Sequence, residues 1–288
     1  MKNLKFILFW ISQILSFPLM AQTVSNVQAE QVGKKNVVTY SLDKQTDILT
    51  FTVNGVTFNM VKVAGGTFTM GATKEHEYFD ADDARPAHQV TLTDYYIGQT
   101  EVTQALWEAV MGNNPSNFKG ENLPVENAYW DDCQAFIEKL NRLLSKDLGG
   151  KHFALPTEAQ WEFAARGGTE STGYKYAGSN NLDDVAWYRD NSVEQTHPVA
   201  QKQPNELGLY DMSGNVAELC QDWYGSYSSD AQTNPQGPAR DPFRALRGGH
   251  WRSEAKDCRV SVCRHADDHL DFLQLHLGYI GLRLCLIP

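Results

Sequence analysis

The second half of the chain constrains the fold most, because it is long and has almost no helical periodicity. From Gly168 onward, glycine, proline, asparagine and aromatic residues dominate, as in the run 234–238. Irregular segments of this length in compact domains are usually held by a metal, a disulfide or aromatic packing. With 42% apolar and 11% aromatic residues, the chain can bury a sizeable core. We therefore predict an α+β fold with much irregular structure.

The first half carries a β-hairpin signature. Apolar and polar residues alternate over 49–53 and again over 56–60, and Asn54-Gly55 separates the two runs. Asparagine and glycine both accept the positive φ angles that a tight hairpin turn requires. The sequence therefore predicts two antiparallel strands joined at this dipeptide.

Three segments have the apolar spacing of helices. The first is 104–111, and the second is 131–148, where apolar residues recur every three or four positions. The third is 158–166, which begins with Thr157 and Gln160 at the spacing of a capping box. We expect each helix to bury one apolar face.

The first 21 residues look like a signal peptide. Lys2 and Lys5 precede a mostly apolar run that ends near the small residue Ala21. At about 15 residues, this run is shorter than the roughly 20 that a membrane-spanning helix needs. We expect an exported protein, in the periplasm or outside the cell, with no transmembrane segment.

These patterns divide the chain into three parts. Residues 1–21 form the signal peptide, and 22–55 form an N-terminal extension that includes the start of the hairpin. Within that extension, the polar stretch 22–35 is expected to be poorly ordered. Residues 56–288 form the main domain. The net charge of −10 argues against nucleic acid or anionic lipid as a partner.

Several short motifs occur in an order that is specific in combination. They are GGTFTMG (65–71), RPAH (85–88), PVEN (124–127), LPTEAQWE (155–162), GLYDMSGNV (208–216), RGGHW (247–251) and GLRL (281–284). Through them, residues 56–288 resemble the formylglycine-generating enzyme (sulfatase-modifying factor) family. The resemblance implies one domain with a C-type-lectin-like fold. A fold does not by itself give a function.

The resemblance makes position 253 decisive for activity. The family's oxidases bind copper through two cysteines five positions apart, and here Cys258 matches the second while the first is Ser253. Thiolates hold Cu(I) well, whereas a hydroxyl does not. We therefore expect no copper cofactor and no catalytic residue, and favour a ligand-binding or envelope-assembly module. The alternative is an oxidase that uses Cys258, either converting a protein cysteine to formylglycine or performing a related metal-dependent oxidation.

The resemblance also implies a calcium site. Asp211 and Glu218 match carboxylate ligands of the family, and Gly214 and Val216 match positions that contribute backbone carbonyls. Calcium prefers such oxygen ligands. The alternative is that these residues bind no calcium: Asp211 would then be hydrogen-bonded to its own turn, and Glu218 would be a surface glutamate.

A second implied feature is an exposed binding face near the C-terminus. It looks like the variable region of ligand-binding proteins that retroelements diversify, and loops on a rigid scaffold suit such recognition. The alternative is an exposed loop that has drifted. The ligand, a protein or a small molecule, stays open. The candidate binding residues are Trp251, Arg252, Ser253, Glu254, His265, Asp267, Asp268, His269 and Asp271.

Five cysteines allow at most two disulfides, and export makes disulfides chemically possible. The family fold brings the segments of Cys220 and Cys258 near each other, so the resemblance favours that pair. The sequence leaves the pairing itself open.

Overall fold

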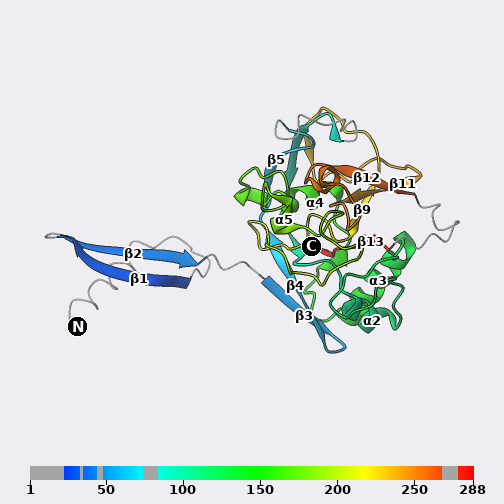
Figure 1. Cartoon of the computed structure of the whole chain (residues 1–288), viewed down its shortest axis with the longest axis horizontal. Helices are drawn as coiled ribbons and strands as arrows, with labels where there is room; N and C mark the ends of the chain where they lie inside the picture. Colours follow the sequence, from blue (N-terminus) through cyan, green and yellow to red (C-terminus); the bar gives the residue numbers. More distant parts are fainter. Residues whose placement is uncertain (1–22, 33–34, 44–47, 74–83, 268–277) are drawn as a thin grey trace. The chain divides into compact units, whose positions relative to one another are not determined.

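The computed structural model describes residues 23–32, 35–43, 48–73, 84–267 and 278–288 (Figure 1). The predicted signal peptide, 1–21, lies outside these residues. The chain divides into two compact units, Met1–Asp47 and Ile48–Pro288. The division falls before the predicted hairpin, so both hairpin strands belong to the second unit.

The first unit contains a hairpin of its own. Strand β1 (Thr23–Val32) pairs antiparallel with β2 (Lys35–Asp43) (Figure 1). This differs from the prediction that 22–35 is poorly ordered. Polar residues in this stretch alternate with β-branched valines, which favour extended backbone and tolerate polar neighbours in a strand.

The second unit begins with an antiparallel five-stranded sheet. The hairpin turn lies where it was predicted, with φ of 46° at Asn54 and 86° at Gly55. Every neighbouring pair in this sheet is antiparallel. The strand order is β3 (Ile48–Val53), β4 (Val56–Val63), β7 (Tyr95–Gly98), β14 (Cys285–Ile287) and β8 (His152–Ala154).

Two smaller sheets complete the strand structure of the described residues. One has the order β10 (Gln232–Thr233), β6 (His88–Leu92) and β5 (Gly66–Met70). The other has the order β12 (Cys263–Asp267), β11 (Phe243–Arg247), β9 (Ala217–Trp223) and β13 (Ile280–Gly281). The second sheet pairs strands that lie far apart in the sequence, and it supports the candidate site.

The three predicted helices are confirmed. They are α2 (Gln104–Met111), α3 (Trp130–Leu143) and α4 (Glu158–Ala165). Helix α3 ends before the predicted residue 148. Shorter helical turns are η3 (Gly168–Glu170), α5 (Leu182–Val185) and η4 (Ala255–Cys258).

Helices α2 and α3 bury their apolar faces against the five-stranded sheet. The rings of Trp107 and Phe136 stack with centroids 4.9 Å apart, which joins the two helices. Phe153 on β8 packs edge-on against Phe51 on β3 at 5.3 Å. Burial of such aromatic side chains is the main favourable contribution to folding here.

Buried amide side chains hold much of the irregular segment. Asn205 donates to the carbonyl of Ala164 at 2.7 Å and accepts from two backbone N–H groups that follow it. Asn215 donates to the Glu101 carboxylate at 2.7 Å and accepts from a backbone N–H at 3.0 Å. These side chains replace the backbone hydrogen bonds that regular elements would supply.

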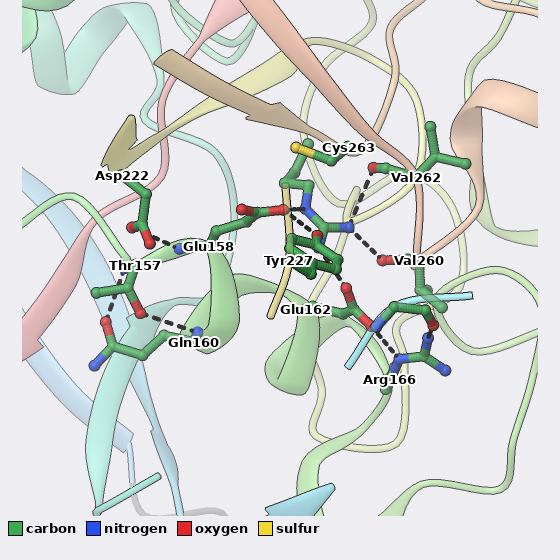
Figure 2. Close-up of polar contacts among 12 residues, drawn as sticks. Thr157, Glu158, Gln160, Glu162, Arg166, Asp222, Tyr227, Val260, Val262 and Cys263 are labelled. Carbon is green, nitrogen blue, oxygen red and sulfur yellow. Dashed lines mark hydrogen bonds and ion pairs between the residues drawn. The ribbon is translucent and has the colours of Figure 1, made fainter. Parts of the chain in front are cut away.

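Helix α4 is anchored by a buried ionic network (Figure 2). The guanidinium of Arg247 on β11 forms ion pairs with Glu158 and Glu162, which lie one turn apart on α4. Glu162 also pairs with Arg166 at 2.8 Å. The two guanidinium groups balance the two carboxylates, so their negative charge is compensated inside the core. The hydroxyl of Tyr227 donates to Glu158.

Candidate ligand-binding site

A cavity of about 210 Å³ opens beside the four-stranded sheet, at the predicted C-terminal face. Strands β9, β11 and β12 supply part of its wall, and the loop between β11 and η4 supplies the rest. The sequence after Arg247 turns sharply there, because Gly248 and Gly249 have φ angles of 89° and 71°. The polar and aromatic side chains that line the cavity are Arg247, His250, Ser253, Asp257, Arg264, His265 and Tyr279.

Ser253 lines this cavity, but its hydroxyl is already hydrogen-bonded within the loop. Its Oγ accepts a hydrogen bond from the backbone N–H of His250 at 3.0 Å, and its own N–H donates to the His250 carbonyl at 2.8 Å. Only 7% of the residue is exposed. The serine therefore closes a tight turn and shapes the cavity wall.

Cys258 does not line the same cavity. Its side chain is fully buried in a separate cluster that includes Tyr176, Leu182 and Tyr188. Burial raises the pKa of the Cys258 thiol, and the nearby Asp257 carboxylate adds to the shift. A thiol in such surroundings stays protonated and unreactive. A serine hydroxyl and a buried, protonated thiol do not supply the two thiolates that hold Cu(I).

Three other predicted binding residues lie on the same loop. Trp251 is buried, and its Nε1–H donates to the Gly278 carbonyl at 2.6 Å, so it supports the loop. Arg252 is exposed and stacks over the Trp251 ring, 5.5 Å from its centroid. Glu254 forms ion pairs with Arg189 and Lys256, each at 3.0 Å. Arg252 and Glu254 are therefore available at the surface.

The remaining predicted residues lie on or beyond β12. His265 is exposed, lines the cavity and packs near Phe243, with ring centroids 4.7 Å apart. Asp267 is the last residue of β12. Asp268, His269 and Asp271 lie outside the described residues.

Sequence reasoning predicted Ser253 and His265 but missed the other five polar and aromatic residues of the cavity. His250 and Tyr279 stack with ring centroids 4.4 Å apart, and Arg264 pairs with Asp257 at 2.6 Å. Burial lowers the pKa of His250 to about 4. Its Nδ1 accepts from the Arg252 N–H at 3.2 Å, so the ring is neutral and its other nitrogen is a donor. The only sequence signal that marks His250 as a candidate site residue is its position inside the RGGHW motif.

Glu218, one of the predicted calcium ligands, is occupied by other contacts. Both of its oxygens accept from Arg283, at 2.7–3.0 Å, and one also accepts from the Trp161 indole at 2.6 Å. Glu218 is fully buried, so Arg283 provides the charge compensation that a buried carboxylate requires. Gly214 and Val216 lie in the turn immediately before β9, which carries Glu218.

Asp211 is better suited to a cation. Its Oδ2 accepts from the Ala200 N–H at 2.7 Å, while its buried Oδ1 has no hydrogen-bond partner. Burial raises the pKa of Asp211 to about 6. Burial also raises the pKa of Glu101, with Asp211 and Glu218 adding to that shift. Three buried carboxylates thus share the single guanidinium of Arg283.

The predicted disulfide between Cys220 and Cys258 is not formed. All five cysteines lie among the described residues, and all are buried free thiols. Cys220, on β9, packs in the cluster that contains Trp161 and Phe163, whereas Cys258 packs with Tyr176. The two thiols therefore belong to different parts of the core.

Comparison with known proteins places this site in a family. The sulfatase-modifying factor enzyme 1-like domain matches residues 44–284. The chain belongs to that family. It is 37% identical to the chaperone protein LppX of Paenibacillus barcinonensis over 251 residues, covering 72% of this chain and 83% of LppX. It is 27% identical to the formylglycine-generating enzyme of Streptomyces coelicolor over 291 residues, covering 77% and 88%.

A solved structure shares the fold. Treponema denticola variable protein 1 superposes with a TM-score of 0.75 and 34% identity, covering 84% of this chain and 99% of that one. The chain also matches three Chlamydia proteins named serine/threonine-protein kinase pkn1, and spans 34% or 35% of their length. The family membership and the α+β formylglycine-generating-enzyme-type fold predicted from the sequence are therefore confirmed.

Proposed function

We propose that this family member is an exported ligand-binding module that lacks the copper oxidase chemistry. The observation that carries the proposal is the chemistry at the two key positions, a hydroxyl at Ser253 and a buried thiol with a raised pKa at Cys258. Ser253 lines the 210 Å³ cavity, while Cys258 is buried in another cluster with a raised pKa. An oxidase of this type needs two thiolates at one accessible place. Among the described residues, that arrangement is absent.

The cavity supports a binding role. It presents a neutral histidine donor, an exposed Arg264–Asp257 pair and the stacked ring of Tyr279 on a rigid sheet. Aromatic and polar groups held in a concave surface are typical of ligand sites. LppX is named a chaperone protein and the Treponema denticola chain a variable protein, and neither name states an oxidase reaction. No helix among the described residues is long and apolar enough to cross a membrane.

Replacement of two cavity residues tests this function. A His265→Ala, Tyr279→Ala double variant removes the aromatic side chains but leaves the sheet backbone intact. We expect immobilised full-length protein to retain a defined set of envelope proteins or glycans. The amount retained by the double variant should be at least tenfold lower. The matched control is Asp190→Asn, an exposed residue that does not line the cavity. Equal retention by the wild-type chain and the double variant contradicts the proposal.

Calcium binding at Asp211 is a second proposal, supported by its unpartnered buried oxygen and by the excess of carboxylates around Arg283. Asp211, with backbone carbonyls of the turn at Gly214 and Val216, would hold the ion. We expect millimolar Ca²⁺ to raise the melting temperature of the wild-type chain but not that of Asp211→Asn. An identical response of the two proteins contradicts calcium binding at this position.

A further inference from the structure

A second cavity, of about 480 Å³, lies on another part of the molecule. It is enclosed by the start of α4, the end of β9, the strand β6 and the loop over 225–238. None of its lining residues belongs to the 210 Å³ cavity. The residues that line it are Met70, His88, Glu158, Ala159, Asp222, Gly225, Ser226, Tyr227, Ser228, Gln232, Thr233, Pro235, Gln236, Gly237 and Pro238.

Two buried polar side chains, Asp222 and His88, line this cavity. Asp222 is 3% exposed, and its Oδ2 accepts from the Glu158 backbone N–H at 2.9 Å, as Figure 2 shows. Among the described residues, this carboxylate otherwise accepts only from its own backbone N–H. His88 is 5% exposed, and its Nδ1 lies 3.2 Å from the Pro86 carbonyl. A carbonyl only accepts, so Nδ1 carries the proton, and in the neutral ring Nε2 is a hydrogen-bond acceptor.

The charge of Asp222 has no cation beside it in the cavity. Lysine and arginine are absent from the described lining residues. The guanidinium of Arg247, which acts on Asp222 from outside the cavity lining, is bound to Glu158, Glu162, Tyr227 and two backbone carbonyls, which satisfy its donors. A buried carboxylate without a cation destabilises a fold. Such a residue facing a cavity is characteristic of a binding site, where the ligand supplies the missing charge.

The aromatic and apolar residues of the cavity lining can contact the hydrocarbon part of a small organic molecule. The rings of His88 and Tyr227 lie 5.2 Å apart and form an aromatic wall. Pro235, Pro238 and Met70 add apolar surface. An aromatic face attracts a cation, and apolar walls accept a hydrocarbon chain or ring.

We propose that this cavity binds a small organic molecule through its primary ammonium group, with Asp222 as the counter-ion and His88 Nε2 as the second acceptor. A primary ammonium has three N–H donors, enough to bond both acceptors. Its hydrocarbon part lies against Tyr227 and the two prolines. This site is independent of the ligand cavity at Ser253.

Binding of β-phenylethylamine to the full-length chain tests the proposal. Its affinity is compared with that of 2-phenylethanol, which has the same body but no charge, by titration calorimetry at pH 8. We expect the amine to bind at least tenfold more tightly than the alcohol. Asp222→Asn, which keeps the oxygen that accepts from Glu158, is expected to weaken amine binding at least tenfold and to leave alcohol binding unchanged.

Two further variants test whether the compounds bind in this cavity and whether the charge of Asp222 in particular is required. Ser226 is exposed at the cavity lining, so Ser226→Trp fills the space without disturbing the core and should abolish binding of both compounds. Asp190→Asn removes one negative charge elsewhere on the surface and should change nothing. Equal binding of amine and alcohol, unchanged amine binding in Asp222→Asn, or an equal loss in Asp190→Asn would each overturn the proposal.

Discussion

At the scale of single residues, buried carboxylates govern how this protein responds to pH. Burial raises the pKa of Asp222 from 3.8 to about 7, and the neighbouring Glu158 carboxylate adds to the shift, while Arg247 opposes it. The folded state therefore favours the protonated form of Asp222. Its contribution to stability is fully present below pH 3.8 and is lost as the pH rises through about 7.

This predicts that Asp222→Asn is more stable than the wild-type chain at pH 8. The neutral amide avoids the cost of a buried charge but leaves one N–H donor to satisfy. We therefore expect a gain of roughly 1–3 kcal/mol in the free energy of unfolding. Denaturant titrations at pH 8 and pH 4 provide the check. The gain should disappear at pH 4, and a variant that is less stable at both values contradicts the assignment.

Some site residues could be recognised from the sequence alone, and others could not. The serine at position 253 was evident from the motif around it, because its neighbours define the alignment. The partner of Glu218 was not, since Arg283 is 65 positions away and only the fold brings the two together. For the same reason, the stacking of His250 on Tyr279 could not be predicted.

At the scale of elements, local signals specified the helices and the hairpin. The Thr157 Oγ1 accepts from the Gln160 N–H at 3.2 Å, and the Gln160 side chain accepts from the Thr157 N–H at 2.9 Å. Both partners of this capping box lie within one turn, so the sequence reveals them. The sheet β12-β11-β9-β13 has no such local signal, because its strands are short and their partners are distant in the chain.

Removal of the capping box should destabilise α4 and the ionic network on it. Thr157→Ala leaves a helix N–H without its acceptor and is expected to cost about 1 kcal/mol. Gln160→Ala removes the reciprocal bond. Because the two bonds form one unit, the double variant should lose less than the sum of the single losses. Thermal unfolding of the three variants measures this, and strict additivity would show that the box does not act as a unit.

At the scale of the whole molecule, the second unit holds together without disulfides. All five cysteines are buried free thiols in the described structure. Long irregular segments are held instead by buried amides such as Asn205 and Asn215, and by the Arg247 and Arg283 ion pairs. The sequence suggested a metal, a disulfide or aromatic packing for this purpose, because single asparagines carry no visible signature.

A thiol count tests this arrangement. The folded chain, purified without reductant, is expected to react with almost no Ellman's reagent, because every thiol is buried. After denaturation, still without reductant, five thiols per chain should react. A count of three would reveal one disulfide, and a count of one would reveal two.

The most direct test of the non-catalytic assignment is conversion of a cysteine-containing sulfatase peptide by the full-length chain. The purified protein is supplied with Cu(I) and oxygen, and formylglycine in the peptide is measured by mass spectrometry, with an active formylglycine-generating enzyme as the positive control. Because position 253 carries a hydroxyl and the Cys258 thiol is buried, we predict no aldehyde above the level of copper alone. Copper-dependent conversion of the peptide by this chain would contradict the account.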